Sequence, residues 1–296
     1  MVCLHPFWLD KEKFAVPCGR CLPCKIMRTH AWATRLQVER EYWRDAAFVT
    51  LTYEDKQLPP TLRPRHLQLF FKRLRKALAP RKIKYFACGE YGDKGGFVKE
   101  GIFAGKFVHR PHYHAIIFGV SPVTDRQVIM DCWKYCNWQM LEEKAIGTVT
   151  YDSCRYVAGY VQKKLYGEEA KKAYDDMHLA PFVRMSKGLG LQFALDNKDL
   201  LEQSLGVGMR GYVVSLPHYF RDKLGIDPEL IKRKHMELVE NDFEKYLQSH
   251  GYAKSKRSEA MFSYHDFKAG RPLRERRSID LHNKMAIQSG DYFEEF

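Results

Sequence analysis

The stretch HYHAIIFG, residues 112–119, decides the expected fold of this chain. It is rich in β-branched and aromatic residues and ends at Gly119, a pattern that predicts a β-strand. Successive side chains of a strand point to opposite faces, so His112 and His114 lie on the same face. Two imidazoles placed in this way can chelate one divalent ion. The alternative is a pair of edge-strand histidines without a function.

Strands and helices alternate on both sides of this stretch. The patterns predict strands at 46–53, 82–92, 112–119 and 147–152, and helices at 63–79, at 121–136 and from residue 154 onward. The order strand, helix, strand, strand, helix, strand, helix matches the split β-α-β, or ferredoxin-like, plan. We therefore expect an α+β fold, in which an antiparallel sheet carries helices on one face, with helical additions at the C-terminal end.

The organisation along the chain predicts three regions. We expect a cysteine-rich segment at 1–45, a core domain at 46–190, and an accessory helical region with a basic tail at 191–296. The stretch DPELIKRKHMELVENDFEKYLQ, which begins at residue 227, has the composition of a helix, and KAGRPLRERRSIDLHNK at 268–284 is typical of a basic tail.

The charge of the chain indicates a polyanionic partner. Its 49 Lys and Arg residues outnumber 36 Asp and Glu residues, which gives a formal net charge of +13. A balance of this kind favours nucleic acid, although a generally basic protein is the alternative. No run of 18 apolar residues is present, and the start MVCLHPFWLDKEKF has no long apolar segment. We therefore expect neither a signal peptide nor a membrane partner.

A carboxylate is expected beside the two histidines. Glu90 lies in ACGEYGD, at the end of the strand expected at 82–92. If this strand pairs with 112–119 as a hairpin, Glu90 falls beside His112. One carboxylate and two imidazoles would leave positions open on a bound ion, which could then polarise a phosphate oxygen. The alternative for Glu90 is a solvated turn residue.

A pair of tyrosines lies on the helix that begins near residue 154. In CRYVAGYVQKKL, Tyr156 and Tyr160 are four residues apart and share one helix face, and Lys163 returns to the same face. Tyrosine is a weak nucleophile because its pKa is about 10, so it needs a neighbour that assists proton loss. Lys163 could hold the anion or a scissile phosphate. The alternative is a helix that packs two tyrosines into the core.

The N-terminal segment holds a cluster of cysteines. CGRCLPC places Cys18, Cys21 and Cys24 close together, and Cys3 lies upstream. Four thiolates are enough for a structural zinc ion. The same spacing also occurs in iron–sulfur proteins, and free thiols are the third alternative.

Together these features resemble the HUH-type replication initiators, whose endonuclease domain has an RRM-like sheet. The residues that carry the resemblance are the strand FVTLTY at 48–53, the His-hydrophobic-His strand, and the Tyr-x-x-Lys helix, in this order. The double tyrosine in YVAGYVQKK and the cysteine-rich start resemble the rolling-circle initiators of microviruses, in the gokushovirus branch. The resemblance covers roughly residues 1–190.

The resemblance implies a metal-dependent DNA endonuclease and strand transferase. It implies that Glu90, His112 and His114 hold Mg²⁺ or Mn²⁺, and that a tyrosine cuts single-stranded DNA at the viral replication origin. That tyrosine stays joined to the 5′ end, the freed 3′-OH primes synthesis, and the second tyrosine allows the circle to be resealed. Lys163 follows Tyr160 by three residues, whereas Gly159 occupies the matching place after Tyr156, so we expect Tyr160 to be the more efficient nucleophile.

The resemblance also implies partners and a location. The sequence contains no P-loop, so we expect a host helicase to unwind the DNA and a host polymerase to extend it, in the bacterial cytoplasm. Two rival functions stay open. One is a non-catalytic, zinc-stabilised nucleic-acid-binding protein, and the other is a plasmid relaxase or transposase with the same chemistry. A covalent protein–DNA product excludes the first rival, and the choice of origin separates the second.

Overall fold

The computed structural model describes residues 3, 5, 7–9, 14–92, 95–140, 145–163, 179–209, 211–252 and 260. Contacts between Cα atoms divide the chain into two compact units, one of Lys25–Leu224 and one of Met1–Cys24 with Gly225–Phe296. The domain boundaries expected near residues 45 and 190 stay a prediction. Among the described helices, none is long and apolar enough to cross a membrane.

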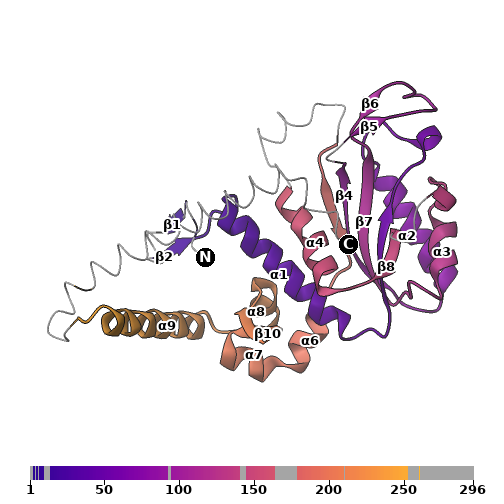
Figure 1. The fold of residues 1–296 in the computed structure, drawn as a ribbon. Coiled ribbons are helices and arrows are strands. Elements are labelled where there is room, and N and C mark those ends of the chain that lie inside the picture. The colour runs from indigo at the N-terminus through magenta and orange to yellow at the C-terminus, as the bar shows by residue number, and fades with distance from the viewer. Residues whose placement is uncertain are drawn as a thin grey trace. The chain divides into compact units, whose positions relative to one another are not determined.

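The larger unit is built on a five-stranded sheet in the order β8-β3-β7-β4-β9, in which every neighbouring pair is antiparallel (Figure 1). The strands are β3 (Ala46–Leu51), β4 (Lys84–Tyr91), β7 (Pro111–Phe118), β8 (Ile146–Thr148) and β9 (Phe182–Met185). The α+β class and the antiparallel sheet expected from the sequence are confirmed. The stretch HYHAIIFG lies in the central strand, β7, and β9 is an edge strand that the sequence patterns did not predict.

One face of the sheet is covered by α2 (Pro64–Leu78) and α3 (Arg126–Cys132) (Figure 1). The apolar positions of α2 recur at helical spacing, and Phe70 and Leu74 are fully buried in one cluster with Ile117 of β7. The basic face of α2 is left toward solvent, as the amphipathic pattern predicts.

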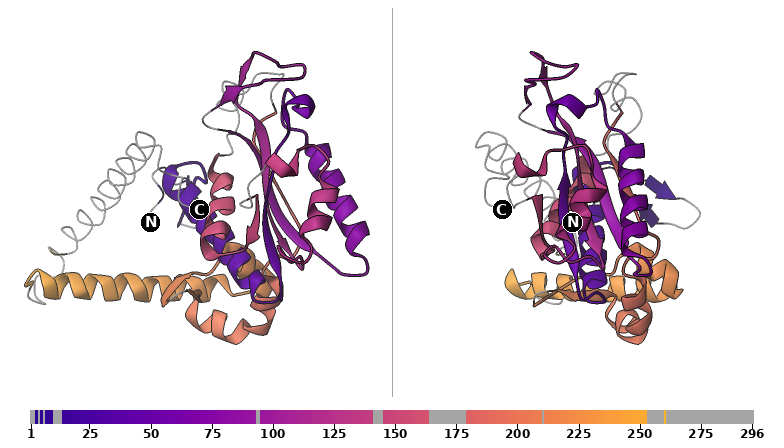
Figure 2. Two further views of the ribbon diagram at one scale, coloured as in Figure 1. Left: turned by 45° about the vertical axis from the view of Figure 1, so that its right-hand side comes forward. Right: turned by 90° about the vertical axis from the view of Figure 1, so that its right-hand side faces the viewer.

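The opposite face of the sheet is covered by α1 (Leu22–Arg40) and α4 (Tyr151–Lys163) (Figure 2). Leu36 of α1 and Val157 of α4 are fully buried in one cluster with Ile116 of β7. This cluster positions α4, and with it both tyrosines, over the face that carries the two histidines.

Helices therefore lie on both faces of the sheet, where the sequence patterns led us to expect them on one. The reason is the composition of β7, whose residues Ala115, Ile116, Ile117 and Phe118 are all fully buried. A strand that is apolar on both faces needs cover on both sides, and an antiparallel sheet with one polar face would not provide it.

The described part of the larger unit also contains short hairpins and short helices. These elements are β5 (Gly96–Phe97) with β6 (Phe107–Val108), β10 (Gly206–Met209) with β11 (Tyr212–Ser215), the 3₁₀ segments η1 (Asp55–Gln57) and η2 (Trp138–Met140), and α6 (Leu191–Asp196), α7 (Lys198–Ser204) and α8 (His218–Leu224). The expected helical additions after residue 190 thus include a β-hairpin.

The smaller unit contains a hairpin and a long helix. β1 (Phe7–Leu9) pairs with the antiparallel strand β2 (Phe14–Val16). The helix expected after residue 227 is α9 (Pro228–Ser249), and the side chain of Asp227 caps it by accepting a hydrogen bond of 2.9 Å from the backbone N–H of Glu229. The basic tail expected at 268–284 lies outside the described residues.

The helix expected at 121–136 is shorter than its pattern. The carboxylate of Asp125 accepts a hydrogen bond of 2.8 Å from the backbone N–H of Ser121 and pairs with Arg81 at 2.7 Å. These contacts hold the residues after Ser121 in turns, so α3 begins only at Arg126.

The helix that carries the tyrosines begins earlier than expected. The hydroxyl of Ser153 accepts from the backbone N–H of Thr150 at 2.8 Å, and the hydroxyl of Thr150 accepts from that of Ser153 at 3.1 Å. This reciprocal cap satisfies backbone donors at the N-terminus, and α4 therefore begins at Tyr151.

Candidate active site

The pairing of β4 with β7 brings a carboxylate and two imidazoles together. Glu90 is opposite His112 in the register of the two strands, and Cys88 is opposite His114. Glu90 is 4% exposed and His114 is 6% exposed. The hairpin pairing expected from the sequence is therefore confirmed, whereas a solvated turn position for Glu90 is not what the structure shows.

The ligand atoms of the three residues converge. Nε2 of His112 lies 3.1 Å from Oε1 of Glu90, and Nε2 of His114 lies 3.4 Å from the same oxygen. One such atom from each of the three residues can be chosen so that all lie within 4.8 Å of one another. The group is a candidate metal site, because buried carboxylates and imidazoles at this spacing are common ligands of divalent ions.

Hydrogen bonds on the far side of each ring orient the histidines. Nδ1 of His112 lies 3.1 Å from the carbonyl oxygen of Arg110, and Nδ1 of His114 lies 3.0 Å from the hydroxyl of Thr50. A carbonyl can only accept, so in a neutral His112 the proton is on Nδ1 and Nε2 presents a lone pair to Glu90. Two acceptors that face each other in a buried site need a cation or a proton between them, which fits a metal-binding group.

Both tyrosines of α4 reach this group. The hydroxyl of Tyr156 lies 3.3 Å from Nε2 of His114. The ring of Tyr160 stacks on the ring of His114, with centroids 5.4 Å apart and planes 11° apart. The structure thus brings the three candidate ligands and the two candidate nucleophiles into one cluster.

The two tyrosines differ in depth. Tyr156 is half-buried, whereas Tyr160 is 6% exposed. Burial raises the pKa of Tyr160 far above its usual value, and the negative charge of Glu90 and hydrogen bonds to Glu90 and Tyr156 raise it further. The sequence-based expectation favoured Tyr160 on account of Lys163. Lys163 is the last residue of α4, and its side chain lies outside the described part of the chain.

Two residues of β3 contribute to the site without having been singled out from the sequence. Thr50 is opposite His114 in the β3–β7 register, and the ring of Phe48 stacks on His114 with centroids 5.9 Å apart. Both residues belong to the FVTLTY stretch that carries part of the family resemblance. The signal for them was that stretch, but their role depends on a strand register that the sequence does not state.

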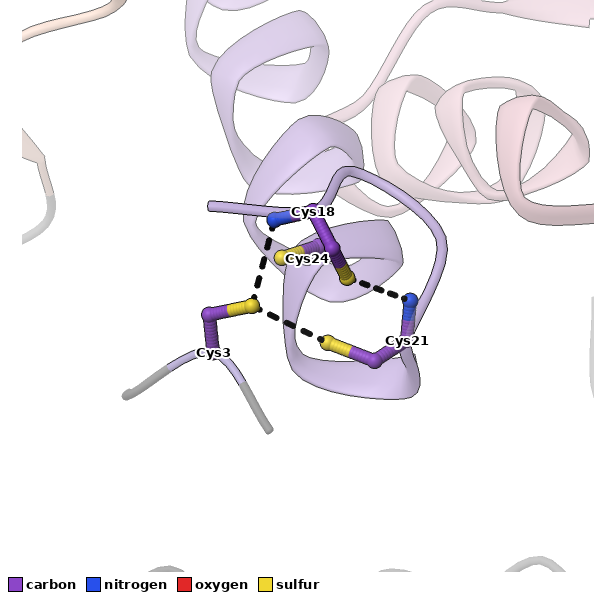
Figure 3. A group of neighbouring side chains, drawn as sticks. All are labelled: Cys3, Cys18, Cys21 and Cys24. Atoms are coloured by element: carbon purple, nitrogen blue, oxygen red, sulfur yellow. Dashed lines mark hydrogen bonds between the residues drawn. The ribbon is translucent and has the colours of Figure 1, made fainter. Parts of the chain in front are cut away.

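A second cluster, of four cysteines, lies in the smaller unit (Figure 3). The sulfur atoms of Cys3, Cys18, Cys21 and Cys24 all lie within 4.8 Å of one another, and those of Cys3 and Cys21 are 3.8 Å apart. The backbone N–H of Cys18 donates to the sulfur of Cys3 at 3.2 Å. All eight cysteines of the chain are free, so the group is a candidate metal site and not a disulfide framework.

The thiols of this cluster differ in their surroundings. Hydrogen bonds from the backbone N–H groups of Cys21 and Arg20 lower the pKa of Cys18 to about 6. Burial raises the pKa of Cys24 to about 12. One member therefore favours the thiolate and another, in the absence of an ion, favours the thiol.

The fold and the Glu-His-His group define a class of protein. An antiparallel α+β sheet that carries a buried group of this kind, with tyrosines of an adjoining helix beside it, has the arrangement of an HUH-type protein. The family model for replication-associated protein ORF2 matches residues 46–165. This range contains Glu90, both histidines, both tyrosines and Lys163.

Comparison with curated proteins identifies the family. The chain is 34% identical over 209 residues to replication-associated protein ORF2 of Spiroplasma virus 4, and 30% identical over 246 residues to replication-associated protein VP4 of Bdellovibrio phage phiMH2K. It is 25% identical over 233 residues to replication-associated protein ORF4 of Chlamydia phage 1. The chain belongs to the replication-associated proteins of single-stranded DNA phages, and the resemblance to microvirus initiators is confirmed.

The extent of these matches differs between the relatives. They cover 62%, 72% and 71% of this chain, and 58%, 69% and 54% of the Spiroplasma virus 4, phiMH2K and Chlamydia phage 1 proteins respectively. The chain thus matches little more than half the length of two of the three relatives. No solved structure matches it.

Proposed function

We propose that this chain is the endonuclease that starts rolling-circle replication of a viral single-stranded DNA. It nicks and rejoins the viral strand at the replication origin through covalent 5′-phosphotyrosine intermediates. The observation that carries the proposal is the 3.3 Å distance between the hydroxyl of Tyr156 and Nε2 of His114, a candidate metal ligand. A packing tyrosine has no reason to point its hydroxyl at a Glu-His-His group, whereas a nucleophile must lie beside the group that binds the scissile phosphate.

The Glu-His-His group fits a hard divalent ion such as Mg²⁺ or Mn²⁺. Glu90 offers a carboxylate oxygen, and His112 offers Nε2 because its Nδ1 proton is held by the Arg110 carbonyl 3.1 Å away. When bound, such an ion supplies positive charge that polarises a phosphate oxygen. Thr50 and the Arg110 carbonyl keep the two imidazoles in the orientation that this binding requires.

The nucleophilic step uses one phenol oxygen. We propose that Oη of Tyr156 attacks the phosphorus, that the bond between phosphorus and the 3′ oxygen breaks, and that the phosphate stays esterified to the tyrosine. The phenol loses one proton and the departing 3′ oxygen gains one, which leaves a 3′-OH that can prime synthesis. The phosphotyrosine bond conserves the energy of the broken bond, so no nucleotide cofactor is required. Lys163 is proposed to hold the phosphate.

Tyr160 is proposed to act second. After one round of synthesis it attacks the regenerated origin, and the 3′-OH of the displaced strand attacks the first phosphotyrosine to reseal the circle. Two nucleophiles one helical turn apart can serve one phosphate-binding group, because Tyr156 and Tyr160 both contact the ring of His114 at centroid distances of 5.1 and 5.4 Å.

The cysteine cluster is proposed to hold a structural zinc ion. Tetrahedral zinc with Zn–S bonds of about 2.3 Å separates its sulfur ligands by roughly 3.8 Å. The sulfurs of Cys3 and Cys21 have that separation, 3.8 Å. With Cys18 and Cys24 they form a complete set of four ligands, which closes the site to substrate and indicates a structural role.

The proposed partners follow from the proposed chemistry. They are the viral single-stranded DNA and its origin, a host helicase and a host polymerase, and the proposed location is the cytoplasm of the bacterial host.

One experiment tests the proposal directly. The full chain is incubated with Mn²⁺ and circular single-stranded DNA from a phage that encodes it, and the products are separated on a denaturing gel. We expect a covalent protein–DNA adduct that requires the divalent ion and is absent with a chelator. Binding without any adduct would support the rival, a non-catalytic nucleic-acid-binding protein. An adduct on plasmid transfer origins but not on phage DNA would support a relaxase.

A further inference from the structure

The hairpin β5–β6 joins the two strands that carry the candidate metal ligands. It follows β4, which carries Glu90, and precedes β7, which carries His112, and it lies beyond that end of the sheet (Figure 1). Phe97 is 71% exposed, Phe107 is 55% exposed and Ile102 is 78% exposed. These are three of the twelve large apolar side chains that are exposed in the described part of the chain, so exposure is concentrated here instead of being scattered.

The two phenylalanines form a cross-strand pair. Phe97 is opposite Phe107 in the hairpin register, and their rings meet edge to face with centroids 5.4 Å apart. The ring of His109 meets Phe107 at 6.0 Å. An aromatic pair on water-facing positions gains little for folding, because most of its apolar surface stays in contact with solvent.

The hairpin is fixed to the body of the unit despite its exposed tip. Val98 is 2% exposed and belongs to the main core cluster. The carboxylate of Asp55 accepts a hydrogen bond from the backbone N–H of Lys99 at 2.6 Å and pairs with Arg110 at 2.6 Å. Gly101 has a φ of +81°, and a Cβ there would lie 2.8 Å from the carbonyl oxygen of Asp55, so this close approach requires glycine.

The charge of the hairpin is positive. Residues 95–110 carry Lys99, Lys106 and Arg110 against one carboxylate, Glu100. Glu100 is itself paired with Lys56 at 3.1 Å. Exposed aromatic rings among exposed cations are the composition with which proteins bind single strands, since rings stack on bases and cations neutralise phosphates.

The hairpin is close to the Glu-His-His group along the chain and in the sheet. The carbonyl of Arg110 accepts from the backbone N–H of Gly92 at 3.0 Å and lies 3.1 Å from Nδ1 of His112, so one peptide contacts both the hairpin base and a candidate ligand. Four residues separate Val108 from His112, a span of at most about 14 Å. Nucleotides that flank a phosphate bound at the group are therefore within reach of the hairpin.

We propose that the β5–β6 hairpin is a stacking platform for bases of single-stranded DNA, with Phe97 and Phe107 as the stacking rings. The inference rests on the proposed function for the identity of the strand. It adds a binding site for the bases beside the site for the scissile phosphate, and it assigns a role to side chains that the catalytic group does not use.

The test measures binding of the full chain to fluorescein-labelled oligothymidylate, which carries no origin sequence, by fluorescence anisotropy at several salt concentrations. The double variant Phe97→Ala with Phe107→Ala should bind roughly ten-fold more weakly, or worse, within the range found when base–aromatic stacking is removed. The dependence of affinity on salt should not change, because no cation is lost. Val213→Ala is the matched control, since Val213 is 69% exposed on β11, and it should bind as the parent does.

A second variant separates stacking from folding. Phe97→Trp with Phe107→Trp keeps aromatic rings and should retain binding. Binding by the alanine variant that equals the parent's would overturn the proposal, and so would a stable tryptophan variant that binds as weakly as the alanine variant. If the alanine variant instead changes from dimer to monomer in sedimentation with unchanged DNA affinity, the surface is an interface between copies and the proposal is wrong.

Adduct formation on phage origin DNA, assayed in parallel with the parent protein, distinguishes this inference from the proposed function. An active parent whose oligothymidylate binding does not depend on the two phenylalanines contradicts the platform alone. A parent that forms no adduct contradicts the proposed function, while the platform is still decided by the binding data.

Discussion

Oε1 of Glu90 lies 3.1 Å from Nε2 of His112 because the two residues are directly opposite each other in the antiparallel ladder of β4 and β7. The contact joins positions 22 residues apart in the chain, and it places the carboxylate on the sheet face that α4 covers. The register of one strand pair therefore assembles the centre of the candidate site.

Loss of the imidazoles should remove cleavage and leave DNA binding. We expect His112→Ala with His114→Ala to form no covalent adduct in Mn²⁺, because Glu90 alone cannot hold the ion. Affinity for a single-stranded oligonucleotide should stay within about two-fold, since phosphate contacts come from dispersed Lys and Arg side chains. Adduct formation on a denaturing gel and anisotropy measure the two effects. His218→Ala, at an exposed histidine of α8, is the control, and full nicking by the double variant would sink the metal assignment.

Removal of single tyrosine hydroxyls should separate the two nucleophiles. We expect Tyr156→Phe to reduce the adduct on a simple origin oligonucleotide more than Tyr160→Phe does, because Tyr156 is half-buried and Tyr160 is 6% exposed. This order reverses the one suggested by Lys163. Each single variant should keep some adduct, the double variant should form none, and circle closure should fail in both singles.

The control for the tyrosine variants is Tyr85→Phe, which changes a partly buried tyrosine of β4 that packs on the core. Loss of a hydroxyl at a packing position costs on the order of 1 kcal/mol and leaves the chemistry intact. Thermal unfolding should therefore show similar, small changes for all single variants. An adduct formed by the double variant would mean that both tyrosines serve packing only.

Removal of one cysteine ligand should release a metal ion. We expect the purified chain to contain about one zinc ion, and Cys21→Ser to lose it together with several degrees of melting temperature. Cys136→Ser changes a half-buried cysteine outside the cluster and should retain the zinc. Elemental analysis and thermal unfolding measure both. Zinc-free protein with a melting temperature that Cys21→Ser does not change would show that the thiols are free, and a brown, iron-containing protein would indicate a cluster.

A methyl group at Gly89 should destabilise the sheet next to the candidate site. A Cβ at this position would lie 2.9 Å from the ring of Phe182 and 3.0 Å from that of Tyr113, so one buried ring must shift. We expect Gly89→Ala to cost about 1–3 kcal/mol of unfolding free energy. Gly147→Ala, in β8, meets no atom within 4 Å and should be close to neutral. Urea unfolding of both variants tests the contrast, and equal stability would contradict it.

Local patterns predicted much of the site. Strand alternation was enough to put His112 and His114 on one face, and helical spacing was enough to put Tyr156 and Tyr160 on another. Hairpin pairing of the strands at 82–92 and 112–119 then predicted the position of Glu90. These inferences hold because the repeat of a strand or a helix is a property of the backbone and needs no knowledge of distant residues.

Other features were decided by contacts that no local pattern contains. The reciprocal cap of Thr150 and Ser153 moved the start of α4, and the ion pair of Arg81 with Asp125 moved the start of α3. Cover on both faces of the sheet followed from the burial of β7, because apolar surface must be removed from water wherever it lies.

The sequence by itself thus determined the antiparallel α+β plan, the family, and the identity of the candidate ligands and nucleophiles. Only the tertiary structure decided that Thr50 orients His114, that Cys3 approaches Cys21, and that Tyr160 lies deeper than Tyr156. The physical reason is that residue spacing fixes direction along one element, whereas depth and partnership depend on how separate elements pack to bury their apolar surface.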